Sequence, residues 1–280
     1  FVPSRGLGDV YKRQPLRDAD DESLIIYTSG STGQPKGVLH SFRTISVTTK
    51  GLTGVLNAGT QDRMLSYLPL AHGMDRWLSE CTSLYNGIHV FFAESLDTFV
   101  DDLKRARPTL FVSVPRLWLK FQLGVFSKMP PKKLDLYMKI PILSGIVKKK
   151  VLTNLGLDSV RFAGSGSAPI PAELLSWYRN LGLELLEGYG MSENFNYSHI
   201  TMPGRGRAGY IGHPYPDVDC KLSEEGEILI KSPGNMVGYY KDPARTKDAF
   251  TADGYLKTGD RGEIDSDGRL RITGRVKELF

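Results

Sequence analysis

The 280-residue sequence is poor in cysteine and contains no long apolar run. Its two cysteines, Cys81 and Cys220, lie far apart and belong to no CxxC or Cys/His cluster. This excludes a disulfide scaffold and a zinc ribbon and predicts a reducing, cytoplasmic compartment. No apolar stretch reaches about 18 residues, so no transmembrane helix is expected. Residues 1–14 lack both periodicity and the apolar core of a signal peptide, and we interpret them as a non-native leader.

The composition is otherwise that of a folded protein. Hydrophobic residues make up 40% and charged residues 24% of the chain, which excludes disorder, fibres and coiled coils. The net charge of +5 is compatible with an anionic substrate or with membrane headgroups, and it does not require nucleic acid.

Short apolar runs alternate with helical patterns between residues 15 and 204. We expect strands at Leu24–Thr28 and Thr109–Ser113 and helices at His40–Leu56 and Arg116–Phe126. This rhythm predicts an α/β fold with a mostly parallel sheet. From 205 to 274, short runs such as Tyr255–Lys257 and Gly262–Ile264 are separated by Gly/Asp turns, which predicts a smaller antiparallel β subdomain.

The segment Lys128–Lys150 is both basic and amphipathic, with seven lysines among apolar residues. Such a segment can lie on an anionic membrane surface, which would make the protein peripheral to the inner face of the membrane. The alternative is a solvated, lysine-rich helical hairpin whose apolar side packs on the body of the protein.

The segment Tyr27–Val38 has the composition of an anion-binding loop. It follows a strand and combines three glycines, four hydroxyl residues and Lys36. Glycines let backbone N–H groups approach an anion, and hydroxyls and a lysine add donors and charge. The loop is not a Walker P-loop, because Gly37 follows Lys36 where that motif requires Ser or Thr, and this excludes a P-loop kinase.

Two further segments carry residues suited to a nucleotide. In Glu187–Glu193, an aromatic between two glycines can stack on a purine, and a serine and a carboxylate can serve a phosphate and Mg²⁺. In Gly254–Asp260, the carboxylate of Asp260 can accept from the two hydroxyls of a ribose, and Arg275 can reinforce this contact. The alternatives are a buried strand end for the first segment and ordinary turn chemistry for the second.

Together and in this order, these segments resemble the AMP-forming adenylating superfamily of acyl-CoA synthetases, peptide-synthetase adenylation domains and beetle luciferases. The resemblance covers about Asp21 to Phe280 and is closest to long-chain fatty acid–CoA ligases. It is supported by segments similar to the family's gate motif, its adenine-platform loop and its branch-specific signatures: Pro69–His72, Gly164–Pro169, Met191–Glu193, Gly238–Lys241 and Leu270–Arg275. The implied fold is the large N-terminal domain of the adenylate-forming enzymes.

The resemblance implies an acid–thiol ligase that uses ATP, Mg²⁺ and coenzyme A and acts on a fatty acid. It assigns catalytic roles to Thr28, Lys36, His72 and Glu193, of which Thr28 and Glu193 are also the implied metal ligands. It assigns nucleotide contacts to Ser29, Gly30, Ser31, Thr32, Gly33, Gly166, Ser167, Ala168, Tyr189, Gly190, Ser192, Asp260 and Arg275.

The resemblance also implies that the chain is a fragment. Residues 275–280 match the start of the family's hinge, with Lys277 at the hinge position, and we expect a C-terminal domain and an N-terminal part beyond this sequence. We therefore expect the ATP- and AMP-binding core of a ligase, with little activity of its own. An adenylation domain for another carboxylic or amino acid, or an inactive nucleotide-binding fragment, are the alternatives.

Overall fold

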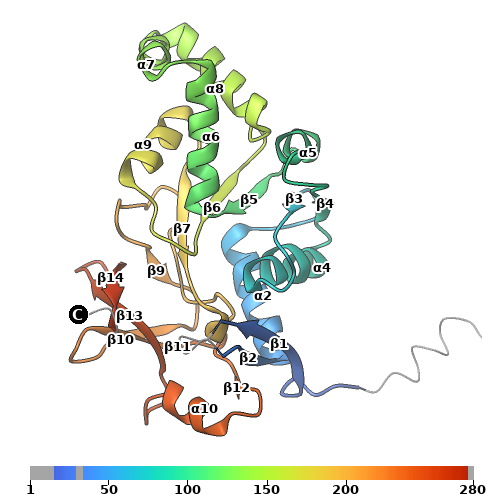
Figure 1. Cartoon of the computed structure of the whole chain (residues 1–280), viewed down its shortest axis with the longest axis vertical. Helices are drawn as coiled ribbons and strands as arrows, with labels where there is room; N and C mark the ends of the chain where they lie inside the picture. Colours follow the sequence, from blue (N-terminus) through green and yellow to red (C-terminus); the bar gives the residue numbers. More distant parts are fainter. Residues whose placement is uncertain (1–15, 30–33, 277–280) are drawn as a thin grey trace, which may run out of the picture.

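The computed structural model describes residues 16–29 and 34–276 and has the expected α/β architecture (Figure 1). In this part of the chain the strands form sheets of three, four, two and five strands. None of its helices is long and apolar enough to cross a membrane. The leader proposed for residues 1–14 lies outside the described residues.

The anion-binding segment is framed by an antiparallel hairpin. Strands β1 (Glu22–Thr28) and β2 (Lys36–Ser41) pair antiparallel, and β12 (Gly238–Tyr239) adds to the other edge of β2. The predicted helix therefore begins later than His40, as α2 (Phe42–Leu56). Residues 36–41 remain extended because they lie between two strands, and the Ser41 hydroxyl accepts the Thr44 N–H to cap α2.

Parallel strands form the centre of the α/β part. β3 (Arg63–Ser66) pairs with β4 (His89–Phe92), and β5 (Leu110–Ser113), β6 (Phe162–Ser165) and β7 (Leu185–Tyr189) form a parallel array. Strands β8 (His199–Ile200) and β9 (His213–Pro214) extend this array antiparallel.

Helices cover both faces of the β5–β6–β7 array and create two separate cores. α2, α3 (Gly73–Asp75), the π-helical turn η1 (Arg76–Cys81) and α4 (Thr82–Asn86) lie on one side. α5 (Phe99–Ala106), α6 (Pro115–Lys128), α8 (Pro141–Leu155) and α9 (Ala172–Leu181) lie on the other. α7 (Pro131–Lys139) and α8 project beyond the sheet as a helical hairpin (Figure 1).

A small antiparallel sheet follows, ordered β10 (Asp219–Leu222), β11 (Glu227–Lys231), β13 (Leu256–Ile264) and β14 (Leu270–Arg275). The helix α10 (Pro243–Ala249) lies between β12 and β13. The two short strands expected at Tyr255–Lys257 and Gly262–Ile264 are one continuous strand, β13. Gly259 and Gly262 do not end it, because β11 and β14 pair with it along both edges. The boundaries proposed for the two parts, 15–204 and 205–274, remain predictions.

Candidate functional site

Thr28 and Lys36 are opposite each other at the loop end of the β1–β2 hairpin. They are the last register pair before the connecting loop, so the hairpin fixes both ends of that loop. Ser29 is exposed beside Thr28. Four residues to which nucleotide contacts were assigned lie outside the described residues: Gly30, Ser31, Thr32 and Gly33.

Lys36 reaches across to Glu193, which lies far away in the sequence. The Lys36 Nζ atom is 2.5 Å from Glu193 Oε1 and donates to the Tyr239 hydroxyl at 2.8 Å. That hydroxyl in turn donates to Glu193 Oε1 at 2.9 Å, so the three groups form a closed triangle. Burial lowers the pKa of Lys36, but the hydrogen bonds to Glu193 and Tyr239 outweigh burial and raise it. Lys36 is therefore a cation at neutral pH.

The turn that carries Glu193 is held tightly by its surroundings. Glu193 lies in the short 3₁₀ turn η2 (Ser192–Asn194), directly after β7, and its carbonyl accepts the Met236 N–H at 2.8 Å. The carbonyl of Ser192 accepts from His40 Nε2 at 2.8 Å. Burial lowers the pKa of His40 to about 4, so this imidazole is neutral and acts as a fixed donor.

Tyr189, Asp260 and Arg275 form a second cluster at the small sheet. The Tyr189 hydroxyl donates to Asp260 Oδ2 at 2.6 Å, and Arg275 Nη1 lies 3.1 Å from Asp260 Oδ1. Burial, with the Asp260 charge, raises the pKa of Tyr189 well above its usual value, so this hydroxyl remains a donor. The cluster joins the end of β7 to β13 and β14, which pair Asp260 with Arg275 in register.

The two clusters lie near each other along the chain. Tyr189 belongs to the second cluster and Glu193 to the first, and the two residues are four positions apart in the sequence. Four residues span at most about 14 Å between Cα atoms. The Cα atoms of Tyr189 and Glu193 therefore lie within about 14 Å of each other, which brings the two clusters near the same end of β7.

A divalent cation fits the residues at the hairpin end. The buried Thr28 Oγ1 has no hydrogen-bond partner among the described residues, and Glu193 supplies a carboxylate. In this part of the chain there is no cluster of three or more acidic, His or Cys side chains suited to a metal. Mg²⁺ does not need one, because it binds through one or two carboxylates together with substrate phosphates.

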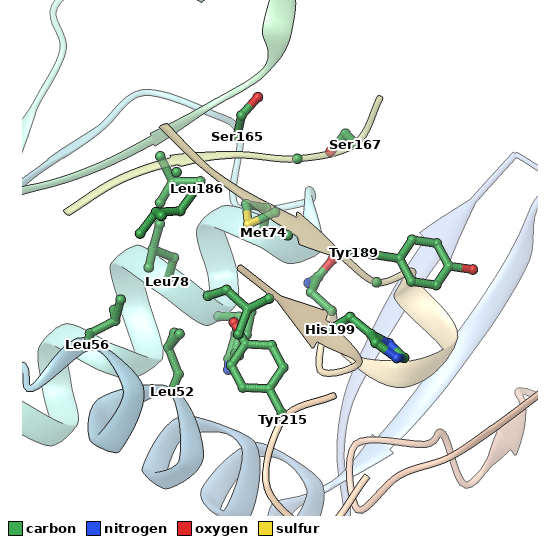
Figure 2. Close-up of a pocket in the computed structure, with 18 of the residues that line it drawn as sticks. Leu52, Leu56, Met74, Leu78, Ser165, Ser167, Leu186, Tyr189, His199 and Tyr215 are labelled. Atoms are coloured by element: carbon green, nitrogen blue, oxygen red, sulfur yellow. The ribbon is translucent and has the colours of Figure 1, made fainter. Parts of the chain in front are cut away.

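Beside the nucleotide clusters lies a narrow cavity of about 50 Å³ (Figure 2). Its walls are mainly apolar and come from α2, η1, β5, β6 and β7, including Leu52, Leu56, Trp77, Leu78, Val112, Phe162 and Leu186. Gly166, Ser167, Tyr189 and Gly190 line its other end, so this end meets the Tyr189 cluster. Figure 2 shows the Tyr189 ring extending away from Leu56 and Leu78. Ala168 is exposed and is not part of the lining.

Three of the lining residues carry buried polar atoms without a partner among the described residues. These atoms are Trp77 Nε1, Ser165 Oγ and Asn196 Nδ2. Buried polar groups are usually hydrogen-bonded, so these three atoms have hydrogen-bonding capacity to spare.

His72 lies beside this site but does not contact the two clusters in the described residues. It is exposed at the start of α3, where its Nδ1 accepts the Met74 N–H at 3.2 Å. The next residue, Gly73, packs against Asn196 and Ile26, because a Cβ there would lie 3.2 Å and 3.4 Å from their side chains. Lys277, the expected hinge residue, lies outside the described residues.

Sequence reasoning missed Tyr239 and His40 as parts of the site. The Gly238–Lys241 segment was noted only as a family signature, and nothing in its pattern indicated that Tyr239 would contact Lys36. His40 follows two buried residues on β2, and a single histidine on an apolar strand gives no signal of its partner.

A comparison with protein families and with known proteins gives a consistent result. Residues 4–240 match the family model described as AMP-binding enzyme. The chain is 34% identical over 290 residues to a putative fatty-acid–CoA ligase FadD11 of Mycobacterium tuberculosis, covering 93% of this chain and 51% of that protein. It is 35% identical over 309 residues to human long-chain-fatty-acid–CoA ligase 1, covering 98% and 44%.

Solved structures show the same fold. ATP-bound MatB from Rhodopseudomonas palustris has a TM-score of 0.76 and 28% identity, covering 94% of this chain and 50% of that one. The N-terminal domain of FACL13 from Mycobacterium tuberculosis has a TM-score of 0.73 and 24% identity, covering 94% and 63%. The chain spans about half the length of the curated relatives it matches.

Proposed function

The chain belongs to the AMP-binding enzyme family, and on this premise we propose that it is the ATP- and AMP-binding core of a long-chain fatty acid–CoA ligase. In the reaction, a fatty acid carboxylate attacks the α-phosphate of ATP to give an acyl-adenylate and pyrophosphate. The thiol of coenzyme A then displaces AMP to give the thioester. The observation that carries the proposal is the proximity of the Lys36–Glu193 and Tyr189–Asp260 clusters, since Glu193 follows Tyr189 by only four positions.

The hairpin end is proposed to hold the triphosphate. Lys36 is a cation and would bind the β- and γ-phosphates together with the loop from Ser29 to Gly33. Ser192 would bind the α-phosphate. Thr28 and Glu193 would hold Mg²⁺, which when bound neutralises phosphate charge. Since phosphoryl chemistry depends mainly on position and charge neutralisation, these residues need to orient ATP rather than transfer protons.

The second cluster is proposed to hold the nucleoside. Asp260 would accept from the ribose hydroxyls while Arg275 keeps its carboxylate in place. Tyr189 would stack on adenine beside Gly166, Ser167 and Ala168. His72 would lie near the phosphates, and Lys277 would act in the hinge.

The cavity beside Tyr189 is proposed to receive the carboxylate end of the acyl group, since its volume of about 50 Å³ holds only a few heavy atoms. Its unpaired polar atoms lie where a carboxylate could be held, and its far walls are leucines and aromatic rings. Among the lining residues there is no lysine or arginine, and burial lowers the pKa of His199 to about 3, which leaves that side chain neutral. A second carboxylate, as in malonate, would be buried there without a partner, so the lining favours a monocarboxylic, hydrocarbon-chain acid.

Coenzyme A and an anionic membrane are the remaining proposed partners. The long-chain relatives support the thiol acceptor, and the basic α7–α8 hairpin supports a peripheral contact with membranes.

Isothermal titration of the chain with ATP and Mg²⁺ tests the nucleotide part of the proposal. We expect one site, and we expect Asp260→Asn to weaken binding by about tenfold or more, since a hydrogen-bonded charge next to the ribose is lost. Asp267→Asn, on the surface of the same sheet, is the matched control and should bind like the wild type. Equal affinities for all three proteins would contradict the proposal.

Pyrophosphate release across a series of acids from acetate to palmitate tests the acyl part. We expect an enzyme that contains this chain to prefer the long chains, because relatives that the chain matches are named long-chain-fatty-acid–CoA ligases. A preference for acetate or for a dicarboxylate would instead support the adenylation of another acid.

A further inference from the structure

A second, much larger cavity lies on the opposite face of the β5–β6–β7 array from the acyl cavity. It has a volume of about 990 Å³ and lies between α5, α6 and α8. Its walls are mainly apolar and include Phe99, Leu117, Phe121, Val125, Met129, Val147 and Val151. These residues belong to, or pack against, the core on the α6–α8 side, whereas the acyl cavity is lined from the other core. We call this cavity the α6–α8 groove.

Every ionisable side chain of the groove lining other than Tyr67 is a cation: Lys104, Arg116, Lys120, Lys128 and Lys150. Lys104 pairs with the exposed Asp101 at 3.0 Å, and the other four form no ion pair with the described residues. Four cations without acidic partners around an apolar channel complement a ligand that has a hydrocarbon chain and a negatively charged head.

Apolar side chains outside the groove lining are exposed on α6, α7 and α8. On α6, Leu119 and Leu123 are exposed. On the projecting hairpin, Leu136, Ile142 and Ile146 are exposed, and Ile142 reaches 80% of its full accessibility. Apolar side chains mixed with lysines are typical of elements that lie in the headgroup region of a membrane.

We propose that the α6–α8 groove binds one acyl chain of an anionic phospholipid in a bilayer, with the lipid phosphate held by the lysines at its rim. The groove would receive the chain while Leu136, Ile142 and Ile146 enter the surrounding headgroup layer. A free fatty acid in water would fill the groove but leave these three apolar side chains exposed to water. A lipid in a bilayer explains both the groove and the exposed apolar side chains. The site extends the proposed membrane contact and does not depend on the nucleotide chemistry.

Gly124 on α6 offers a way to block the groove without disturbing the fold. It lines the groove, it is exposed, and a Cβ added there meets no atom within 4 Å. The backbone of Gly124 therefore accepts a Cβ without a clash, and Gly124→Phe adds a ring at the groove lining. Gly54 on α2 is an equally exposed helical glycine with no atom within 4 Å, and it lies outside the groove. Gly54→Phe is thus a matched control for the added aromatic surface.

The experiment measures flotation of the 280-residue chain with vesicles of phosphatidylglycerol and phosphatidylcholine in equal parts, and with phosphatidylcholine alone. We expect the wild type and Gly54→Phe to bind the anionic vesicles equally, and Gly124→Phe to bind about tenfold more weakly, the effect of excluding two methylene groups. The double change Lys120→Glu and Lys128→Glu should weaken binding by at least tenfold as well, since each lysine near an anionic surface contributes about fivefold. Melting temperatures establish that each variant is folded.

Equal binding by Gly124→Phe and Gly54→Phe would overturn the proposal, because it would leave only surface charge and no chain in the groove. Equal binding of the wild type to both kinds of vesicle would contradict the proposed preference for an anionic headgroup.

Titration with palmitate in the absence of vesicles is the third part of the experiment. If Gly124→Phe abolished palmitate binding but left vesicle binding unchanged, the ligand of the groove would be a free amphiphile and not a lipid of the bilayer. None of these readouts involves ATP, so failure of the adenylation proposal would leave this one standing.

Discussion

Lys36 and Glu193 are the two charges that the proposed nucleotide would separate. Glu193 is only 5% exposed and Lys36 22%, so each neutralises the other where water is scarce. Removing one partner leaves the other charge unpaired, which costs more than losing both.

We therefore expect Lys36→Met to lower the free energy of unfolding by about 2 kcal/mol, somewhat less than a fully buried pair would cost. Adding Glu193→Gln should recover most of this loss and give a coupling energy of about 1.5 kcal/mol. Urea denaturation of the two single variants and the double variant measures it. The exposed pair Lys221–Asp253 is the control and should show a coupling near zero. Additive effects at Lys36 and Glu193 would contradict the closed triangle.

Glu187, two residues before Tyr189, gives a pH prediction. Burial raises its pKa from 4.5 to about 7, although the Ile170 N–H donates to it. Between these two values the folded protein binds more protons than the unfolded chain, so stability from this group is present at low pH and is lost as pH rises to 7. Glu187→Gln, which imitates the protonated acid, should gain roughly 3 kcal/mol relative to the wild type between pH 4.5 and pH 8.

Denaturation of both proteins at several pH values checks this difference. Burial lowers the pKa values of His40 and His199 from 6.5, so these two groups destabilise the fold as pH falls below that value. Both proteins contain them, so their effect cancels in the comparison. A constant difference across pH would show that Glu187 is not desolvated.

At the residue scale, the sequence predicted which side chains would gather but not how they would touch. Polar and charged side chains are costly to bury without a partner, and this draws attention to Lys36, Glu193, Tyr189 and Asp260. Tyr239 does not stand out, because a tyrosine on a short edge strand is ordinary. Its contact with Lys36 depends on the pairing of β12 with β2, which joins residues 203 positions apart.

At the element scale, the turn after β7 depends on one glycine much more than on its neighbour. A Cβ on Gly190 would lie 2.5 Å from the backbone of Asn196, whereas a Cβ on Gly188 would have its nearest contact at 4.0 Å, with the His199 carbonyl. Backbone cannot move aside as a flexible side chain can, so only Gly190 is required by close approach.

We expect Gly190→Ala to destabilise the protein by about 2 kcal/mol through this clash and to weaken ATP binding by displacing η2. Gly188→Ala, in the same Gly-Tyr-Gly segment, should change stability by less than about 0.5 kcal/mol. Thermal denaturation and titration with ATP provide the two readouts. Similar losses of stability and of ATP affinity in both variants would mean that this segment needs the backbone freedom of glycine, and not the space that a Cβ would occupy.

The boundaries of helices and strands could be predicted where the hydrophobic pattern was strong. The prediction failed where strand pairing determined the boundary. α6 and β5 occur nearly as expected, because a proline starts the helix and an apolar run marks the strand. The extended start of α2 at residues 40 and 41 was missed, because local propensity cannot reveal that β1 and β12 pair with both edges of β2.

At the scale of the whole molecule, the small sheet meets the α/β part at the cluster of Tyr189, Asp260 and Arg275. Tyr189 packs against the apolar cluster of Ile228, Ile230 and Leu270, and its hydroxyl joins Asp260. A nucleotide held by Lys36 and Asp260 would add a further connection between the two parts.

We therefore expect ATP with Mg²⁺ to slow hydrogen exchange in β13 as well as in β2, and Asp260→Asn to abolish the protection in β13 while sparing that in β2. Hydrogen exchange followed by mass spectrometry resolves the two strands. Protection confined to β2 in the wild type would mean that the bound ligand does not reach the small sheet.

The β5–β6–β7 array separates its two cavities by the simple alternation of side chains along a strand. Phe111, Ala163 and Leu185 belong to the core beside the α6–α8 groove, whereas their chain neighbours Leu110, Phe162 and Leu186 belong to the core beside the acyl cavity. Neighbouring residues of each strand therefore face different cavities. Substitutions confined to one of these two sets would change the core beside one cavity and leave the core beside the other as it is.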